Sequence, residues 1–405
     1  MFTINFEDGA ARVGKLTTPN GTIDTPGLKH PDPATLAQYG GSGRQFLGLP
    51  ASNLVVVATA RDPTSYEYSG ALRQATDQWA SIVTHSGGST VTPAEYMAAV
   101  SALLPDIFVA LSDDVPCDSK QQRAAASVTR TLAWLRECLR LREVDASLQR
   151  SALFAAVQGG QYLPERERCA AAVAAEPDVA GYAIGGLGTG ESPNQRHEIL
   201  HAVVGGLPGS KPRLVAGLGT PEEVLEAVAQ GIDLFDMGYL TQVTSGGYAL
   251  GFPLSPPPAA ADGPTTSTLQ QQPAAASAAV DNTPSLGPGS ASNKTQNGSS
   301  CSDSCAEGAG GGGDDTKLNL WALVYRADSR PLVPGCGCFA CRHHTRAYVH
   351  HLLHTHEMLA QVLLEVHNSY HYQRWFEELR KAIAAGRLAQ YSDWFLQRRR
   401  LATMG

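Results

Sequence analysis

Short apolar runs alternate with longer amphipathic stretches through the first part of the chain. The apolar runs between residues 53 and 238 are NLVVVAT, DIFVAL, LFAAVQGG, GYAIGG, RLVAGLG and IDLFDMG. Helix-compatible stretches separate them, and the longest covers about residues 119–149. Strands that are apolar on both faces and alternate with helices are typical of parallel βαβ units. The pattern therefore predicts an α/β protein built on a buried parallel sheet.

Two segments with the same sequence mark one repeating unit of this pattern. Residues 186–189 and 217–220 both read GLGT, and each follows an apolar run and precedes a helix start. In the second copy, Thr220, Pro221 and Glu223 form a capping box with proline at the first helical position. A repeat of about 31 residues with this order is one βα unit, so we expect a (β/α)8 TIM-type barrel.

A doubly wound open sheet is the alternative fold for the same alternation of strands and helices. It is disfavoured because no dinucleotide-binding fingerprint opens the chain. Residues 1 to about 30 predict short strands and turns that precede the barrel.

The composition changes sharply between residues 255 and 316. This segment is rich in Pro, Ala, Ser and Gly and holds almost no large apolar residues, which predicts a disordered insert. It divides the chain into residues 1–254, with the N-terminal segment and most of the barrel, and residues 317–405. The last part is expected to complete the barrel, beginning with a strand at residues 318–325, and to carry a helical subdomain.

The C-terminal segment has the apolar period of long helices. Apolar residues recur at helical spacing from Leu359 to Ile383, and Gly386 is a plausible stop. A reversal of the chain is expected at residues 353–356, between a short helix and a long one.

Composition describes a globular protein with a core and excludes some classes of function. Hydrophobic residues make up 43% of the 405 residues, charged residues make up 17%, and the formal net charge is −7. This balance argues against general adhesion to nucleic acid. No apolar run approaches the length of a bilayer span, and the N-terminus has no signal-peptide pattern. The eight cysteines are scattered apart from one cluster, which suits the reducing cytoplasm.

That cluster is the strongest chemical signal in the chain. Cys336, Cys338 and Cys341 lie within six residues, and His367 follows. Three thiolates and one imidazole are a complete tetrahedral set for Zn²⁺, and a set that leaves no open position indicates a structural ion. A redox motif and an iron–sulfur fragment remain alternatives for the cysteines alone.

The same stretch carries a resemblance to a known family. CGCFACRHHTRAY at residues 336–348, HHLL after it, and His367-Asn368 resemble the zinc subdomain of tRNA-guanine transglycosylases. The resemblance covers nearly the whole chain outside the insert. It implies a TIM-type barrel with a C-terminal helical zinc subdomain that holds one structural Zn²⁺. Family members exchange guanine for a modified base such as queuine at wobble position 34 of tRNAs with GUN anticodons, which read Asp, Asn, His and Tyr.

The resemblance also assigns roles to residues at the ends of the apolar runs. Asp236 matches the family's nucleophilic aspartate, but the residues after it depart from the catalytic pattern. An aspartate at a strand end that caps a turn or helix is the alternative for Asp236. His85 stands in THSGG where catalytic members have a second aspartate, and Ser112 falls where an aspartate reads the purine edge. A shifted register could bring in Asp113 or Asp114 instead. Residues 158–160 (QGG) and 185–187 (GGL) retain the family's base-pocket sequence.

A chain that keeps the zinc motif while these positions are substituted is expected to be noncatalytic. The resemblance then implies a heterodimer with a catalytic queuine tRNA-ribosyltransferase, which contacts tRNA as a complex in the cytoplasm. It also implies a peripheral membrane pool at the mitochondrial outer membrane. A self-sufficient transglycosylase that uses Asp236 and a zinc scaffold unrelated to tRNA are the alternatives. Candidate RNA contacts are Arg123, Arg130, Arg136, Arg140, Arg142 and the terminal Arg398, Arg399 and Arg400.

Overall fold

The computed structural model of the chain describes residues 2–8, 11–18, 21–25, 45, 48, 55–60, 74–84, 87–256 and 315–404. They belong to one compact unit formed by Met1–Pro256 and Gly312–Gly405. Residues 257–314, and with them most of the insert expected at residues 255–316, lie outside the described residues. His85 lies outside them as well.

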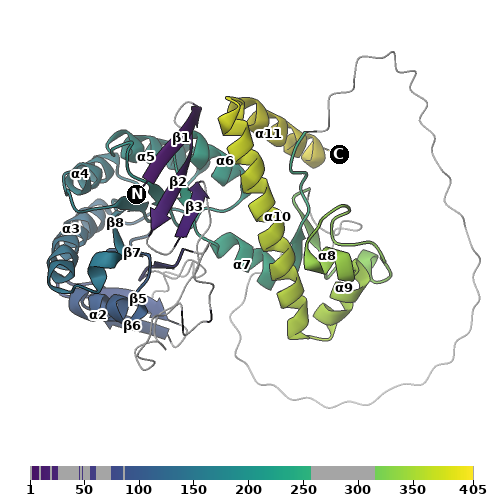
Figure 1. Cartoon of the computed structure of the whole chain (residues 1–405), viewed down its shortest axis with the longest axis horizontal. Coiled ribbons are helices and arrows are strands. Elements are labelled where there is room, and N and C mark those ends of the chain that lie inside the picture. Colours follow the sequence, from purple (N-terminus) through teal and green to yellow (C-terminus); the bar gives the residue numbers. More distant parts are fainter. Residues whose placement is uncertain are drawn as a thin grey trace, which may run out of the picture. The chain divides into compact units, whose positions relative to one another are not determined.

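A parallel sheet forms the centre of this unit (Figure 1). Its strands are β4 (Val57–Ala58), β7 (Ile107–Val109), β8 (Ala152–Val157), β9 (Gly181–Ile184), β10 (Arg213–Val215) and β11 (Leu234–Phe235). They lie side by side in the order β11-β10-β9-β8-β7-β4, so each new strand is added on the same side of the last one. A doubly wound sheet would reverse its direction partway. The alternative of a doubly wound fold is therefore wrong, and the TIM-type α/β fold is confirmed.

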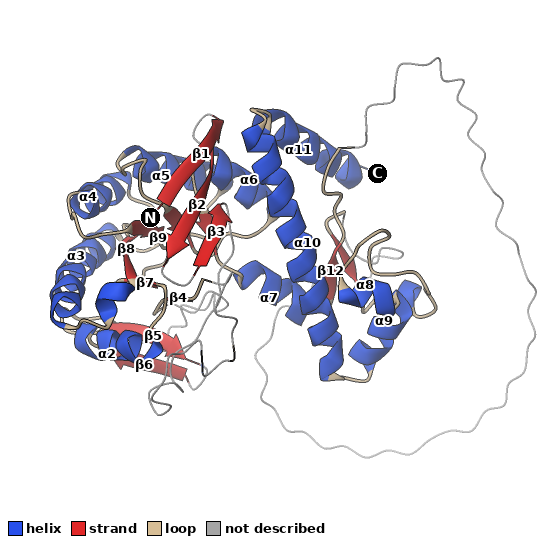
Figure 2. Cartoon of the chain, viewed as in Figure 1, coloured by secondary structure: helices blue, strands red, loops and turns tan. Residues whose placement is uncertain are grey.

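Helices follow the strands, and most of them cover one face of the curled sheet (Figure 2). They are α2 (Pro93–Leu103), α3 (Gln121–Val144), α4 (Leu163–Ala174), α5 (Pro193–Gly205), α6 (Pro221–Ala229) and α7 (Gly238–Ser245), with the 3-10 helix η2 (Leu148–Arg150) after α3. The capping box at Thr220 forms as expected, since its hydroxyl accepts a hydrogen bond from Glu223 N. The two GLGT segments follow β9 and β10, which confirms the repeating βα unit.

Buried aspartates fix the register at the beginning of the strands. Asp106 Oδ2 accepts a hydrogen bond from Val56 N at 2.8 Å, and Asp233 Oδ2 accepts one from Arg213 N at 2.8 Å. Each carboxylate thus joins a strand to its parallel neighbour at the N-terminal ends of the strands. Functional groups in such folds lie at the opposite, C-terminal ends. Both aspartates are nearly inaccessible to solvent.

Two antiparallel sheets lie beside the parallel one. The predicted N-terminal strands are β1 (Phe2–Asp8), β2 (Ala11–Thr18) and β3 (Gly21–Thr25), which pair in that order. Strands β5 (Ala80–Thr84) and β6 (Gly87–Val91) form a separate pair.

The segments on either side of the insert pair with each other. Strand β12 (Tyr248–Leu250) is antiparallel to β13 (Lys317–Asn319), and Gly251 N donates to Thr316 O at 2.7 Å. The strand expected at residues 318–325 is therefore largely wrong. It ends at Asn319 and gives way to the 3-10 helix η3 (Leu323–Tyr325). Leu323 and Val324, which were expected to be part of the strand, lie in this 3-10 helix and are exposed.

Four helices complete the chain. They are α8 (Phe339–His343), α9 (Arg346–His354), α10 (Met358–Ala384) and α11 (Leu388–Met404). The chain reverses between α9 and α10, as predicted, with His356 at φ 55°. Gly386 lies between α10 and α11 at φ 62°, a left-handed conformation that glycine adopts without strain.

Candidate metal centre and barrel mouth

The C-terminal subdomain brings the four predicted metal ligands together. Cys336 precedes α8, Cys338 is its N-cap and Cys341 lies one turn into it, while His367 comes from the middle of α10. Cys338 Sγ accepts a hydrogen bond from Cys341 N at 3.3 Å. This turn therefore presents the sulfur atoms on one side of α8.

The distances among the ligand atoms fit one tetrahedral ion. His367 Nδ1 lies 3.8, 3.5 and 3.3 Å from the sulfur atoms of Cys336, Cys338 and Cys341. All four ligand atoms lie within 4.8 Å of one another. Bond lengths of about 2.3 Å to sulfur and 2.0 Å to nitrogen give tetrahedral edges of roughly 3.5–3.8 Å. The donor set, its spacing and its burial are those of a structural zinc site, and a fully cysteine-ligated cluster would lack its fourth thiolate.

A hydrogen bond from the far side of the ring orients His367. Its Nε2 lies 2.8 Å from Leu250 O in β12, and a carbonyl oxygen can only accept. In the neutral ring, Nε2 therefore carries the proton, and the lone pair of Nδ1 faces the three sulfur atoms. Histidine ligands are typically held in this way, which fixes both tautomer and direction.

The electrostatics of the protein ligands favour binding a cation. The hydrogen bond from Cys341, with a further one from His367, lowers the pKa of Cys336 to about 3 and raises the pKa of Cys341. Burial lowers the pKa of His367, but hydrogen bonds to Cys336 and Cys338 outweigh it and raise the pKa to about 9. Negative charge thus already collects on sulfur, and a divalent ion would replace the proton that balances it.

Polar side chains of α10 next to the ligand bind the free edge of β12. Asn368 Oδ1 accepts from Leu250 N at 2.8 Å, and its Nδ2 donates to Tyr248 O at 3.0 Å. His371 Nε2 lies 2.9 Å from Phe252 O. With His367, these residues replace a neighbouring strand along this edge, because β13 occupies the opposite edge. The metal ligand is therefore part of the joint between the subdomain and the barrel.

Asp236 lies at the end of β11, where the sequence placed it. Its Oδ2 accepts a hydrogen bond from Gly217 N at 2.7 Å, and its Oδ1 accepts one from Gly238 N at 2.9 Å. The side chain is 4% exposed. The carboxylate joins the end of β10 to the beginning of α7, which is the capping role expected of an aspartate at a strand end.

Ser112 lies beside Asp114 and Gln158 at the ends of β7 and β8. Ser112 Oγ donates to Asp114 Oδ1 at 2.7 Å, and Gln158 Nε2 donates to the same oxygen. Asp113 points elsewhere, because Arg123 donates to both of its carboxylate oxygens. Of the two adjacent aspartates, Asp114 is thus the one that meets the glutamine of the retained QGG segment.

Arg166 in α4 holds the glycine-rich turns in place. Its guanidinium donates to the carbonyl oxygens of Gly160 at 2.8 Å and Gly185 at 2.7 Å, and it is fully buried. Burial lowers its pKa. The retained segments at residues 158–160 and 185–187 are therefore joined through one side chain. The sequence analysis missed Arg166, because nothing in the stretch LPERERC distinguishes it from the charged residues beside it.

Several of the candidate RNA contacts are engaged inside the molecule. Arg130 forms ion pairs with Asp77 and Asp113, and Arg123 also pairs with Asp113. Arg399 pairs with Glu222 and Asp315. Arg140 pairs with Glu137 on its own helix, and the side chain of Arg400 lies outside the described residues.

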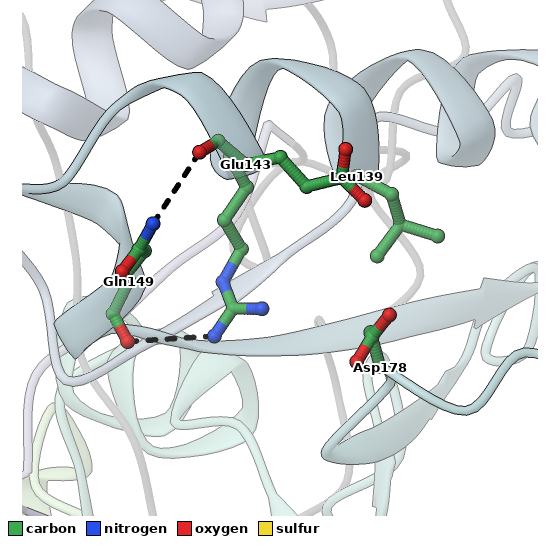
Figure 3. Close-up of a pocket in the computed structure, with 5 residues that line it drawn as sticks. Leu139, Glu143, Gln149 and Asp178 are labelled. Carbon is green, nitrogen blue, oxygen red and sulfur yellow. Dashed lines mark hydrogen bonds between the residues drawn. The ribbon is translucent and has the colours of Figure 1, made fainter.

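A small polar depression lies at the other end of α3 (Figure 3). It has a volume of about 330 Å³ and is lined by Leu139, Arg142, Glu143, Gln149 and Asp178. Arg142 makes only long contacts there, to Leu148 O at 3.4 Å and Gln149 O at 3.5 Å. None of the residues predicted for catalysis or metal binding lines it.

Fold and metal centre together are those of a TIM-type barrel with a zinc-binding helical subdomain. The chain belongs to the queuine tRNA-ribosyltransferase family, whose model matches residues 28–401.

Two similar vertebrate proteins carry the name queuine tRNA-ribosyltransferase accessory subunit 2. The one from Pongo abelii is 35% identical over 362 residues, and the one from Homo sapiens is 35% identical over 366 residues. Each comparison covers 88% of this chain and 81% of the relative. A bacterial queuine tRNA-ribosyltransferase from Pelotomaculum thermopropionicum is 29% identical over 429 residues, covering 98% of both chains.

Among the described helices, none has both the length and the apolar composition that crossing a bilayer requires.

Proposed function

We propose that the chain is the noncatalytic subunit of a heteromeric queuine tRNA-ribosyltransferase. Its partner would be a catalytic subunit of the same family, and the complex would exchange guanine for queuine at position 34 of tRNAs with GUN anticodons. Relatives named accessory subunit, at 35% identity, support this assignment over a self-sufficient enzyme.

The arrangement at the strand ends carries the proposal. Ser112 stands where the resemblance calls for a carboxylate that reads the purine, and its hydroxyl is donated to Asp114. Both oxygens of Asp236 accept backbone hydrogen bonds, which lowers the basicity of a carboxylate and so its strength as a nucleophile. Groups that are already engaged within the chain provide little stabilisation to a reacting sugar. At these strand ends Gln158 Oε1 is the exception, because it is buried and has no hydrogen-bond partner among the described residues.

An exposed apolar surface supports the existence of a protein partner. Met358, Leu359, Val362, Val366 and Tyr370, here called the α10 stripe, recur at helical spacing and are 39–82% exposed. The opposite faces of α10 are buried against the subdomain and the barrel. An apolar stripe along an otherwise packed helix is typical of a surface that another protein covers. Two related barrels can pair through such surfaces.

Guanine exchange into a tRNA with a GUN anticodon tests the proposal. Radiolabelled guanine is offered with the chain alone, with the catalytic subunit alone, and with both. We expect no incorporation by the chain alone and robust incorporation by the mixture. Incorporation by the purified chain alone would instead establish the self-sufficient transglycosylase.

The α10 stripe is tested separately by native mass spectrometry and titration of the two subunits. Val362→Glu combined with Val366→Glu places two charges on the stripe and is expected to weaken the complex about a hundredfold. Gln361→Glu adds a charge to the same helix beside the stripe and serves as the control. Equal affinity of the double variant and the control would remove the stripe from the interface.

The proposal includes a peripheral association of the complex with a membrane, which needs no membrane-spanning helix. Flotation of the heterodimer with vesicles that contain anionic lipid tests it. Recovery of the complex only in the unbound fraction would exclude a peripheral membrane pool of this kind.

A further inference from the structure

Two histidines of α9 lie next to each other outside the cysteine cluster. His350 and His354 are four residues apart, a spacing that places both on one face of a helix. Their ring centroids are 4.3 Å apart, with the ring planes at 53°. His350 is 5% exposed, whereas His354 is exposed at the surface.

Each ring is held by a different backbone carbonyl group. His350 Nδ1 lies 2.8 Å from Leu320 O, and His354 Nε2 lies 3.3 Å from Trp321 O. Because carbonyl oxygens only accept, these two nitrogens carry the protons of the neutral rings. The remaining nitrogens, His350 Nε2 and His354 Nδ1, then each present a lone pair.

The same device orients the histidine of the cysteine cluster. His367 donates its Nε2 proton to Leu250 O and turns Nδ1 toward the sulfur atoms. The indole of Trp321 further limits His354, because the two rings meet edge to face at 5.4 Å. Trp321 itself is fixed by a hydrogen bond from Nε1 to Gly246 O at 3.0 Å. The pair is therefore oriented before any ligand arrives.

We propose that His350 and His354 form a second metal site, which takes an exchangeable borderline divalent cation such as Ni²⁺, Cu²⁺ or Zn²⁺. Neutral imidazole nitrogens are preferred ligands of these ions. Within the described residues, only the cysteine cluster gathers three or more ligand side chains. The pair supplies two ligands and water completes the shell, so it binds more weakly than the cluster.

Another pair with the same spacing shows what the site needs. His197 and His201 of α5 are also four residues apart, but their ring centroids are 6.5 Å apart. His197 Nδ1 already lies 3.0 Å from Gln230 Nε2, which can only donate, so its lone pair is used. Spacing is therefore the same in both pairs, and only the pair in α9 keeps two lone pairs available.

Titration of the full chain, loaded with a single equivalent of Zn²⁺ in the cysteine cluster, with Ni²⁺, followed by isothermal calorimetry, tests the site. We expect one further equivalent of Ni²⁺ to bind the wild-type chain. His354→Gln removes one of the two ligands and should weaken this binding at least about tenfold. His351→Gln, on the same helix, and His201→Gln, in the other pair, should leave it unchanged. Zinc content and the circular dichroism of each variant show whether the fold is retained.

Paramagnetic broadening of the histidine ring signals by Ni²⁺, measured by NMR, tests the site in the wild-type chain. The signals of His350 and His354 should broaden at the lowest Ni²⁺ concentration. Absence of saturable Ni²⁺ binding, unchanged binding in His354→Gln, or first broadening at other histidines would each overturn the site.

Discussion

The cysteine cluster and the strand ends around Ser112, Gln158 and Asp236, here called the barrel mouth, use polar groups in opposite ways. In the cluster, the lone pairs of Cys336, Cys338, Cys341 and His367 converge on one point, and the hydrogen bond to Leu250 O keeps them there. At the mouth, Ser112, Asp114 and Gln158 bond to one another, and Asp236 bonds to the backbone. Groups that converge can bind a ligand, whereas groups engaged with one another mainly stabilise the fold. At the mouth only part of the set is engaged in this way, because Gln158 Oε1 is buried without a hydrogen-bond partner in the part of the chain that the structure describes. Among the described residues, the convergent set of metal ligands lies in the subdomain.

Among the variants that test this comparison, loss of one thiolate should have the largest effect on the stability of the subdomain. Cys338→Ala leaves three ligands, and structural zinc contributes on the order of 10 kcal/mol of binding free energy. We expect loss of the metal and unfolding of α8 and α9, measured by metal analysis and circular dichroism. Cys117→Ala, a buried cysteine outside the cluster, should keep the metal. A metal-free Cys338→Ala chain with full helical content would show that the cluster does not stabilise the subdomain.

Removal of the side chain that binds the edge of β12 should cost less. Asn368→Ala leaves the buried Leu250 N and the partly buried Tyr248 O without their partners, which is expected to cost about 2–4 kcal/mol of the free energy of unfolding. Urea denaturation with zinc present measures it. The neighbouring Ser369→Ala is the control, because its hydroxyl bonds only to Glu365 on the same helix. Equal midpoints for the two variants would mean that β12 needs no such support.

The pH dependence of stability should reveal the burial of His371. Burial, together with the nearby His367, lowers the pKa of His371 to about 4, below the value near 6.5 in the unfolded chain. The unfolded state therefore binds this proton first, and stability that is complete above pH 6.5 declines as the pH falls. Between pH 6.5 and 5 the wild type should lose roughly 1 kcal/mol per pH unit more than His371→Gln. Parallel curves for the two proteins, with zinc in excess, would contradict this assignment.

Substitution at the barrel mouth should have the smallest effect on activity. Asp236→Asn keeps one oxygen acceptor and the shape of the side chain, so the fold should survive. In the heterodimer, the rate of guanine exchange is expected to stay within about twofold of wild type. Asp236 bonds to the backbone of its own chain, so its substitution should change the stability of this subunit and not the reaction in the catalytic subunit. A drop of a hundredfold or more would identify Asp236 as a working nucleophile.

Sequence patterns anticipated the barrel and the metal ligands for physical reasons that the structure makes plain. The GLGT segments, with Gly186 and Gly217 at positive φ, mark strand ends because only glycine tolerates those turns readily. The cysteine spacing identifies a ligand set because few other arrangements need three thiols so close together. Features of this kind depend on residues that are close together in the sequence, so they can be recognised from the sequence alone.

Long-range partners were not visible in the sequence. Asn368 and Tyr248 are separated by 120 positions, and Arg166 reaches Gly185 across 19. A capping role for Asp236 was expected from its place at a strand end, but no local pattern reveals that one of its two donors, Gly217, comes from the neighbouring strand. The strand expected at residues 318–325 failed because pairing with β12 ends at Asn319. These features depend on which segments meet in space, which one sequence does not specify.

The pairing of β12 with β13 makes this protein a natural candidate for division into two fragments. Leu250 belongs to the part before residue 257, whereas His367 and the three cysteines all follow residue 314. A fragment of residues 1–256 and a fragment of residues 315–405 would each expose an unfinished edge, and the ladder, Asn368 and the metal centre would rejoin them. Complementation between separately expressed halves, strengthened by zinc, is the expected behaviour. A reporter domain inserted between residues 256 and 315 would be joined to the fold at two neighbouring points, because the paired strands β12 and β13 lie on either side of it.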